Sequence, residues 1–161
     1  MRFVVLAVLL GTVFAASQAE AFFGWSGSSR SQGASIKSVA AKDGMITVDV
    51  SKLPQMGSQH YRYQEDAQIV RFFVVRDGQG IVRAAVDACD VCWRSGKGYV
   101  LRDGAMLCVN CGMRFAMARI GRASGGCNPH PFRFTVENGS VVIATEELMR
   151  EGASFFSENI R

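Results

Sequence analysis

The feature that most constrains this chain is a doubled Cys-x-x-Cys pattern in its middle. Cys89 and Cys92 form the first pair, and Cys108 and Cys111 form the second pair after fifteen intervening residues. Two thiols separated by two residues can reach one ion, because the turn between them directs both sulfurs to the same side. The spacing therefore predicts a local fold around a metal bound by four thiolates.

Turn chemistry between the two pairs favours a single site. Asp103-Gly104 is typical of a two-residue hairpin turn, and it lies between strand-like residues 99–102 and 105–109. Such a hairpin brings the second pair back beside the first. Gly112, directly after the second pair, permits a tight turn in which backbone N–H groups can point at sulfur.

The spacing leaves the chemistry of the site open. Four thiolates suit zinc, a single iron or an iron–sulfur cluster. Haem of the c type is excluded, because Trp93 and Gly112 stand where a histidine would follow each pair. The alternative to a metal is two disulfides, formed either within each pair or across the hairpin.

A fifth cysteine, Cys127, stands apart in the run Gly125-Gly126-Cys127-Asn128-Pro129. The two glycines allow close approach of the backbone, and Asn-Pro ends the turn. Cys127 is therefore a candidate ligand or a free thiol, since five cysteines cannot all pair within one chain. His130 is a further candidate, because imidazole is a common metal ligand.

The N-terminus predicts export. Residues 1–21 resemble a secretory signal peptide, with Arg2 before an apolar run of fourteen residues and small residues at 19 and 21. An uncleaved membrane anchor is the alternative, although the run is shorter than the roughly 20 residues that a spanning helix needs. We expect the protein outside the cytoplasm, in a periplasm where there is one. Exported cysteines commonly form disulfides, so export strengthens that alternative.

The remaining sequence predicts a mainly β fold with a minor helical part. Residues 22–42 are rich in Gly, Ser and Ala and predict a flexible leader, and residues 43–161 predict one small Cys-rich domain. β-Branched and aromatic runs and the Asp-Gly and Asn-Gly turns predict β-hairpins. The expected strands are 45–50, 68–76, 81–87, 99–102, 105–109, 132–137 and 140–145, and the expected short helices are 113–120 and 146–150, the latter capped by Thr145.

The net charge of +4 is concentrated around the cysteines. Six basic and two acidic residues lie between Cys89 and Cys127, so this stretch accounts for the whole excess. These cations can offset thiolate charge, dock an acidic redox partner, or simply be solvated. Export and the lack of a recognition motif argue against nucleic acid. No hydrolase constellation is visible, so an electron carrier or metal-binding protein is favoured over an enzyme.

Four runs carry a family resemblance. They are residues 84–93 (AAVDACDVCW), 97–99 (KGY), 106–112 (MLCVNCG) and 126–129 (GCNP). The chain resembles the FtrD-like membrane iron–sulfur-containing protein family over roughly residues 45 to 156. The resemblance implies an iron–sulfur centre whose candidate ligands are Cys89, Cys92, Cys108, Cys111 and Cys127.

The resemblance also implies a role beside bacterial uptake of ferrous iron. The iron-uptake members carry a multi-pass membrane portion, whereas this chain shows only the predicted signal peptide, so the resemblance does not extend to a permanent place in the membrane or a direct part in a permease. A redox or iron-transport membrane protein is the expected partner, and the exported protein is expected in the periplasm or associated with the membrane. We therefore expect single-electron transfer or metal handling. Two alternatives are a structural zinc-binding interaction module and a thiol–disulfide redox protein, the latter without the βαβ pattern of thioredoxin.

Overall fold

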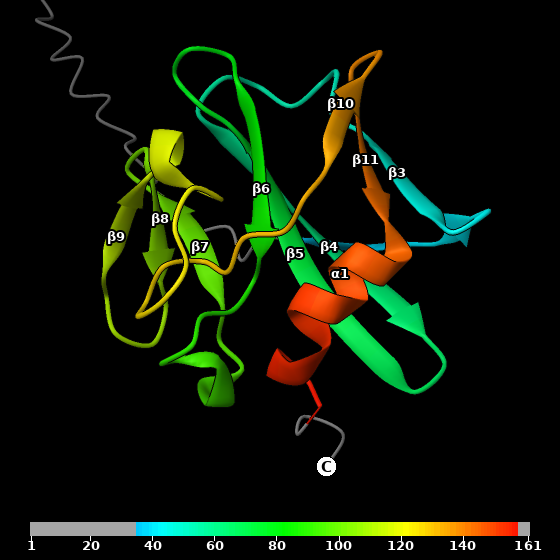
Figure 1. Ribbon diagram of the computed structural model, residues 1–161. Helices are drawn as coiled ribbons and strands as arrows, with labels where there is room; N and C mark the ends of the chain where they lie inside the picture. The colour runs from blue at the N-terminus through cyan, green and yellow to red at the C-terminus, as the bar shows by residue number, and fades with distance from the viewer. Residues whose placement is uncertain (1–34, 158–161) are drawn as a thin grey trace, which may run out of the picture. The chain divides into compact units, whose positions relative to one another are not determined.

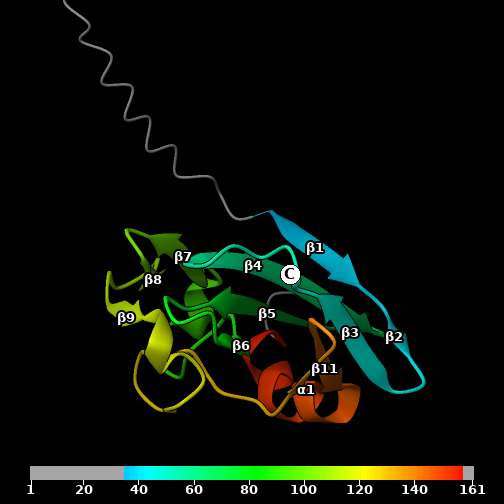
Figure 2. The same ribbon diagram turned by 90° about the horizontal axis from the view of Figure 1, so that it is seen from above.

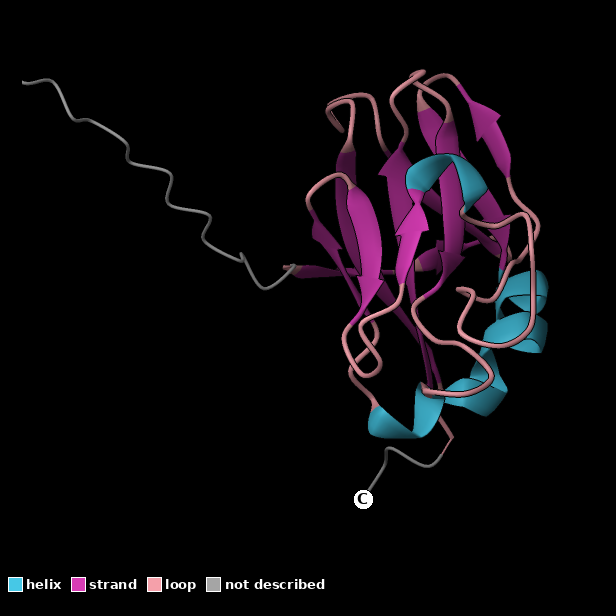
Figure 3. Ribbon diagram, turned by 90° about the vertical axis from the view of Figure 1, so that its left-hand side faces the viewer, coloured by secondary structure: helices cyan, strands magenta, loops and turns pink. Residues whose placement is uncertain are grey.

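The computed structural model describes residues 35–157, which form three β-sheets and a few short helices (Figure 1). The predicted signal peptide and leader residues 22–34 lie outside the described residues. The mainly β fold with a minor helical part is confirmed, and Figure 3 shows a few short helices among predominant strands.

The strands and helices are distributed as follows. The first sheet has the order β1 (Ile36–Val39), β4 (Gly57–Glu65), β5 (Gln68–Arg76) and β6 (Val82–Val86). The second has the order β10 (Thr135–Glu137), β11 (Ser140–Ala144), β3 (Met45–Asp49) and β2 (Ala41–Lys42). The third has the order β7 (Tyr99–Arg102), β8 (Ala105–Cys108) and β9 (Arg114–Ala116). The helices are η1 (Trp93–Ser95), η2 (Met117–Arg119), α1 (Thr145–Gly152) and η3 (Ala153–Phe155).

Strand β5 is buried on both of its faces. Val70, Phe72 and Val74 point into one hydrophobic core, while Phe73 and Val75 point into another. This division follows from the geometry of a strand, in which successive side chains alternate between faces. Figures 1 and 2 accordingly show the β4–β5–β6 strands between the β7–β9 sheet and the β3–β11 pair with α1.

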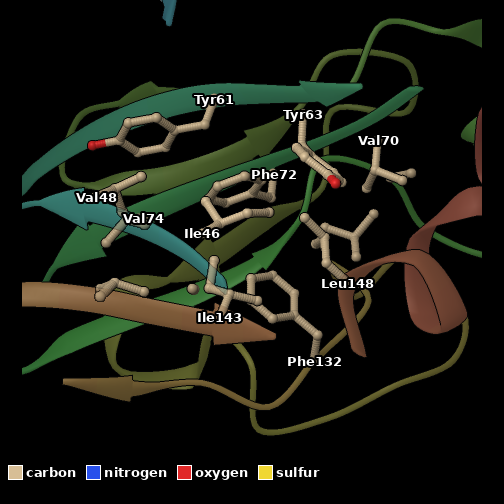
Figure 4. Close-up of a cluster of buried hydrophobic side chains, with 14 of the residues drawn as sticks. Ile46, Val48, Tyr61, Tyr63, Val70, Phe72, Val74, Phe132, Ile143 and Leu148 are labelled. Atoms are coloured by element: carbon tan, nitrogen blue, oxygen red, sulfur yellow. The ribbon is translucent and has the colours of Figure 1, made fainter. Parts of the chain in front are cut away.

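The first core lies between one face of the first sheet and the second sheet with α1 (Figure 4). The alternating residues Ile46 and Val48 of β3 and Val141 and Ile143 of β11 face Phe72, and Leu148 of α1 closes one end. Burying a side chain such as Phe72 stabilises the fold by about 1.5–3 kcal/mol relative to leaving it exposed.

The second core is smaller and contains sulfur. Phe73 and Ala85 pack there against Tyr99 and Met106, the inward residues of the β7–β8 hairpin. Three cysteines also belong to this core, namely Cys89, Cys92 and Cys108. The side of the first sheet that faces the third sheet is therefore the side that carries the thiols.

Two of the predicted hairpin turns have the backbone conformation that their residues favour. Asp103 and Gly104 have φ of 47° and 72°, and Asn138 and Gly139 have φ of 49° and 77°. Positive φ at both central residues defines the turn that matches the twist of paired strands. The hairpins β5–β6, β7–β8 and β10–β11 are confirmed.

The helix predicted at residues 113–120 is wrong. Residues 114–116 form strand β9, which pairs with β8, and residues 117–119 form the single turn η2. The N–H of Cys108 donates to the carbonyl of Met113, and Gly112 has φ of 77°. The chain therefore reverses after Cys111 and continues as an antiparallel strand, although Met113 and Met117 have helical spacing.

The other predicted helix exists, but its predicted cap is wrong. Helix α1 extends over Thr145–Gly152, and no side chain caps its N-terminus. The N–H and the hydroxyl of Thr145 both donate to the carbonyl of Gly44 instead. Within the predicted leader, β1 and β2 already belong to sheets, so ordered structure begins before residue 43.

A backbone clamp closes the base of the segment that holds all five cysteines. The N–H of Val86 donates to the carbonyl of His130 at 2.9 Å, and the N–H of His130 donates to the carbonyl of Ala88 at 3.0 Å. Residues 87–129 therefore leave the first sheet and return to it at one point. We call this segment the cysteine segment.

A buried polar cluster ties the first sheet to the cysteine segment. Asp87 accepts a hydrogen bond from the N–H of Tyr99 at 2.7 Å, and Arg71 donates to the carbonyl of Gly96 at 2.7 Å. The Arg71 Nε lies 3.7 Å and the His60 Nε2 lies 3.9 Å from the Asp87 carboxylate. Burial raises the pKa of Asp87 to about 7 and lowers the pKa of His60 to about 4.

The pKa values of Asp87 and His60 shift in opposite directions, so their effects on the pH dependence of stability oppose each other. Substitution of one residue should therefore reveal the effect of the other. From pH 6.5 to pH 5 the native protein holds a proton on Asp87 and the unfolded chain holds one on His60, so their effects on stability cancel. In Asp87→Asn only the unfolded-state proton remains, and we expect the free energy of unfolding to fall by up to about 1.4 kcal/mol per unit of decreasing pH. Urea unfolding at both pH values, with equal metal loading, measures this.

The His60→Gln variant provides the matched control. This variant keeps Asp87, which binds a proton in the native protein, and lacks His60, which binds a proton in the unfolded chain. Its free energy of unfolding should therefore rise as the pH falls over the same range. Equal pH dependence in the wild type and both variants would contradict this account of the cluster.

A second prediction concerns the packing of Gly98 against this cluster. A Cβ at Gly98 would lie 2.4 Å from the Asp87 carboxylate, whereas a Cβ at Gly44 would meet nothing within 4 Å. Both residues have positive φ, so alanine strains the backbone at either site by about 1–2 kcal/mol. We expect Gly98→Ala to cost about 1–3 kcal/mol more than Gly44→Ala, measured by chemical unfolding. Equal losses of stability in the two variants would show that the structure accommodates a Cβ beside the Asp87 carboxylate without cost.

Candidate metal centre

The first cysteine pair lies in a tight turn directly after β6. The N–H of Trp93 donates to the carbonyl of Cys89 at 3.2 Å, and the N–H of Cys92 points at the Cys89 Sγ at 3.3 Å. Ser95 then fixes the end of the turn, since its N–H and its hydroxyl both donate to the carbonyl of Cys92. Both sulfurs of the pair are buried as a result.

The second pair forms the corresponding turn at the end of β8. The pairing of Tyr99 with Cys108 places this pair at the open end of the β7–β8 hairpin, as the Asp103-Gly104 turn predicts. The N–H of Gly112 donates to the carbonyl of Cys108 at 2.9 Å. The N–H of Val109 donates to the carbonyl of Gly98 at 3.0 Å, which joins the second turn to the loop that follows the first.

Cys127 reaches the same place from a third direction. Gly125 and Gly126 have φ of 89° and 58°, and Asn128 returns two hydrogen bonds to the carbonyl of Gly125. The hydroxyl of Tyr99 donates to the carbonyl of Cys127 at 2.6 Å. The loop is therefore held against β7 by a buried side chain that sequence reasoning did not single out.

The structure brings all five predicted cysteines together. Their sulfurs form two groups within which all lie within 4.8 Å of one another, Cys89–Cys92–Cys127 and Cys92–Cys108–Cys111. Cys92 belongs to both groups. The Cys127 Sγ lies 3.5 Å from that of Cys111 and 3.8 Å from that of Cys92.

These separations fit thiolates that share one ion. Four sulfurs at about 2.3 Å from a tetrahedral metal lie about 3.8 Å apart. A cluster distributes its cysteines over several irons, so its sulfurs must stand further apart than around one ion. The donor set itself, five thiols with no carboxylate or imidazole in either group, suits zinc, a single iron or an iron–sulfur cluster.

The environments of the sulfurs differ across the centre. Cys89, Cys92 and Cys108 are buried, Cys127 is partly buried, and Cys111 is exposed. Burial raises the pKa of Cys108 to about 11. The backbone N–H of Met113, pointing at the sulfur, lowers the pKa of Cys111 to about 7, whereas the contact with Cys111 raises the pKa of Cys127. The thiolate is thus most easily formed at the exposed edge.

The basic residues of the cysteine segment do not all surround the sulfurs. Arg114 donates to the carbonyl of Arg102 and pairs with Asp103, at the turn end of the hairpin and away from the sulfurs. Arg94 and Lys97 follow the first pair directly and are exposed. The positive charge next to the centre is therefore smaller than the sequence count suggests.

Neither histidine belongs to the cysteine groups. His130 lies between two carboxylates, with Nε2 at 3.0 Å from Glu151 and Nδ1 at 3.7 Å from Asp90. His60 lies in the buried cluster with Asp87. Ligation by His130 is not supported, because each of its nitrogens faces an acidic side chain.

Comparison with known protein families places the chain in a described family. Residues 53–156, more than half of the chain, match the family described as membrane iron-sulfur containing protein FtrD-like. No curated protein and no solved structure matches the chain. Within the described residues, no helix is long and apolar enough to cross a membrane.

The matched range begins before β4 and ends just after η3, so it includes strands β4, β5 and β6 of the first sheet, the whole cysteine segment and α1. All five cysteines lie within it, and their two groups can hold a metal ion. The family description supplies the nature of that metal as an iron–sulfur centre, and the thiol donor set also admits zinc. The chain belongs to the FtrD-like membrane iron–sulfur-containing protein family.

Proposed function

We propose that this protein is an exported electron carrier with a cysteine-bound iron centre that serves bacterial iron uptake. Its partner would be a redox or iron-transport membrane protein. The observation that carries the proposal is the convergence of five cysteines, in two groups that share Cys92, within a family described as iron–sulfur containing. Cys89, Cys92, Cys108, Cys111 and Cys127 are the proposed ligand set.

The burial of the sulfurs supports electron transfer. Three thiols lie in the second core, where water is excluded, while Cys111 reaches the surface. An electron can thus enter or leave at one edge, and the rest of the centre stays shielded. Val91 and Val109, which lie within the two pairs, and Met113, which follows the second pair, are exposed apolar residues and offer a contact surface beside the cysteines.

Iron bound here would supply a one-electron couple. The protein holds its thiolates with backbone N–H groups, as at Cys89 and Cys111, and these hydrogen bonds stabilise negative charge on sulfur. Because a reduced centre would carry one more negative charge than the oxidised one, the same hydrogen bonds would also favour the reduced form. Tyr99 keeps the third loop in place without approaching the surface.

The direct test is the composition of protein purified without oxygen. We expect iron at one or more equivalents, visible absorption, and a signal in electron paramagnetic resonance that changes with dithionite. Acid-labile sulfide identifies a cluster, and its absence with bound iron identifies a single ion. Colourless protein with stoichiometric zinc would refute the redox function.

A structural zinc site is the second candidate, and the spacing of the sulfurs favours it. Contacts of 3.5 and 3.8 Å match the sulfur separation around one tetrahedral ion, and the thiols contribute to a core that is small. In that case removal of the metal should disorder the cysteine segment, and no redox signal should appear at any potential.

The sharing of Cys92 predicts an order among cysteine variants. Cys92→Ser removes a sulfur from both groups, and Cys127→Ser removes one sulfur from a single group. We expect Cys92→Ser to lower metal affinity by more than about tenfold relative to Cys127→Ser, or about 1.4 kcal/mol. Competition with a chelator of known affinity measures this, and circular dichroism checks that both variants fold. Equal affinities would contradict a central role for Cys92.

A further inference from the structure

We infer that Cys111 and Cys127 are a redox modification site, which closes as a disulfide when the metal is absent. Their sulfurs lie 3.5 Å apart, closer than those of Cys92 and Cys127 at 3.8 Å. The pair joins the second Cys-x-x-Cys to the separate fifth cysteine. It therefore differs from disulfides within either Cys-x-x-Cys pair or across the hairpin.

Access distinguishes this pair from the other thiols. Cys111 is exposed and Cys127 is partly exposed, whereas Cys89 and Cys108 are each only 1% exposed. A soluble disulfide must collide with the first thiol that it oxidises, and Cys111 is the most open of the five cysteines to such attack. The second sulfur then has to lie next to the first, as Cys127 does.

The backbone on both sides can make the remaining movement. A disulfide brings the two sulfurs to about 2.05 Å, so they must approach by roughly 1.5 Å. Gly112, Gly125 and Gly126 lie next to or near the two cysteines, and apart from their chain neighbours no atom lies within 4 Å of where a side chain would begin on any of them. Small rotations there meet no obstacle, whereas Cys89 and Cys108 are packed into the second core.

The chemistry requires one disulfide of low molecular weight or of an exported oxidase as oxidant. The Cys111 thiolate attacks it, forms a mixed disulfide and releases one thiol. The Cys127 sulfur then attacks the Cys111 sulfur and releases the second thiol, and its own proton goes to solvent or to that leaving thiolate. Overall two cysteine thiols are oxidised to one disulfide, and the oxidant is reduced to two thiols.

The disulfide and the metal centre exclude each other. Cys127 belongs to one sulfur group and Cys111 to the other, so the bond takes one ligand from each. Each group then keeps only two thiols, Cys89 with Cys92 and Cys92 with Cys108. The metal must therefore load onto reduced protein, and a reductant of the thiol class must act first on any protein oxidised before loading.

Peptide mapping tests the pairing, because trypsin separates the cysteines. Cleavage after arginine gives residues 84–94 with the first pair, 103–114 with the second pair and 123–133 with Cys127. The metal-loaded protein is treated with chelator and oxidised glutathione together, then alkylated, digested and analysed by mass spectrometry. We expect peptide 103–114 linked to peptide 123–133.

Any other result overturns the inference. A disulfide inside 84–94 or 103–114, a link between 84–94 and 123–133, or five alkylated thiols would each do so. Loaded protein without chelator should keep its thiols, and equal oxidation there would refute the exclusion by metal. This readout does not depend on iron, so a zinc protein would fail the proposed function and still give the linked peptides.

Two cysteine variants test whether the disulfide arises instead by thiol–disulfide rearrangement in protein that is partly unfolded without its metal. Cys108→Ser removes the alternative partner of Cys111 in its own pair, and the link to Cys127 should form undiminished. Cys127→Ser should stop at the mixed disulfide of Cys111 with glutathione, a mass increase on peptide 103–114. Glutathione found instead on Cys89 or Cys92 of the Cys127→Ser protein would contradict the entry of the oxidant at Cys111.

Discussion

The burial of strand β5 on both faces is the constraint on which the rest of the structure depends. A strand with two apolar faces needs a covering layer on each side, because an exposed face would leave large side chains in water. Phe72 requires the second sheet and α1, and Phe73 requires the β7–β9 hairpin layer. The two coverings differ in strength, since the first core contains many more large apolar residues than the second. In the second core, buried thiols occupy positions that large apolar side chains would otherwise fill.

This arrangement makes the metal centre part of the packing. Cys89, Cys92 and Cys108, three of the proposed ligands, are core residues, and the N–H groups of the two Cys-x-x-Cys turns point at the sulfurs of Cys89 and Cys108. Ligands that packing holds in place lose little freedom when a metal binds. Tyr99 and Asp87 extend the support, because one anchors the third loop and the other holds the start of β7.

Sequence reasoning succeeded where a residue's own chemistry decides the conformation. Asp103-Gly104 and Asn138-Gly139 accept positive φ more readily than most dipeptides, so their hairpins could be placed without tertiary information. The convergence of the two Cys-x-x-Cys pairs followed from the turn at Asp103-Gly104. The outcome at residues 113–120 depended instead on pairing with β8, which outweighs helical spacing of two methionines.

Other features could not be predicted, because they depend on partners distant in sequence. Strand β1 is almost wholly exposed and carries no alternation, and only its parallel pairing with β4 defines it. The roles of Tyr99 and Asp87 arise from contacts with residues 28 and 12 positions away. No local pattern marks a phenol that will bind a loop carbonyl, or a carboxylate that will be buried beside Arg71.

The backbone clamp between Val86, Ala88 and His130 has a consequence for how the protein opens. Because the ends of residues 87–129 are joined there, this segment can open cooperatively while the first core, with β3, β11 and α1, keeps its contacts. Amide hydrogens in the segment should then exchange at a rate governed by metal occupancy, and those of β3 and β5 at a rate governed by global unfolding. We therefore expect two cooperative units within one domain, of which the metal centre stabilises only one.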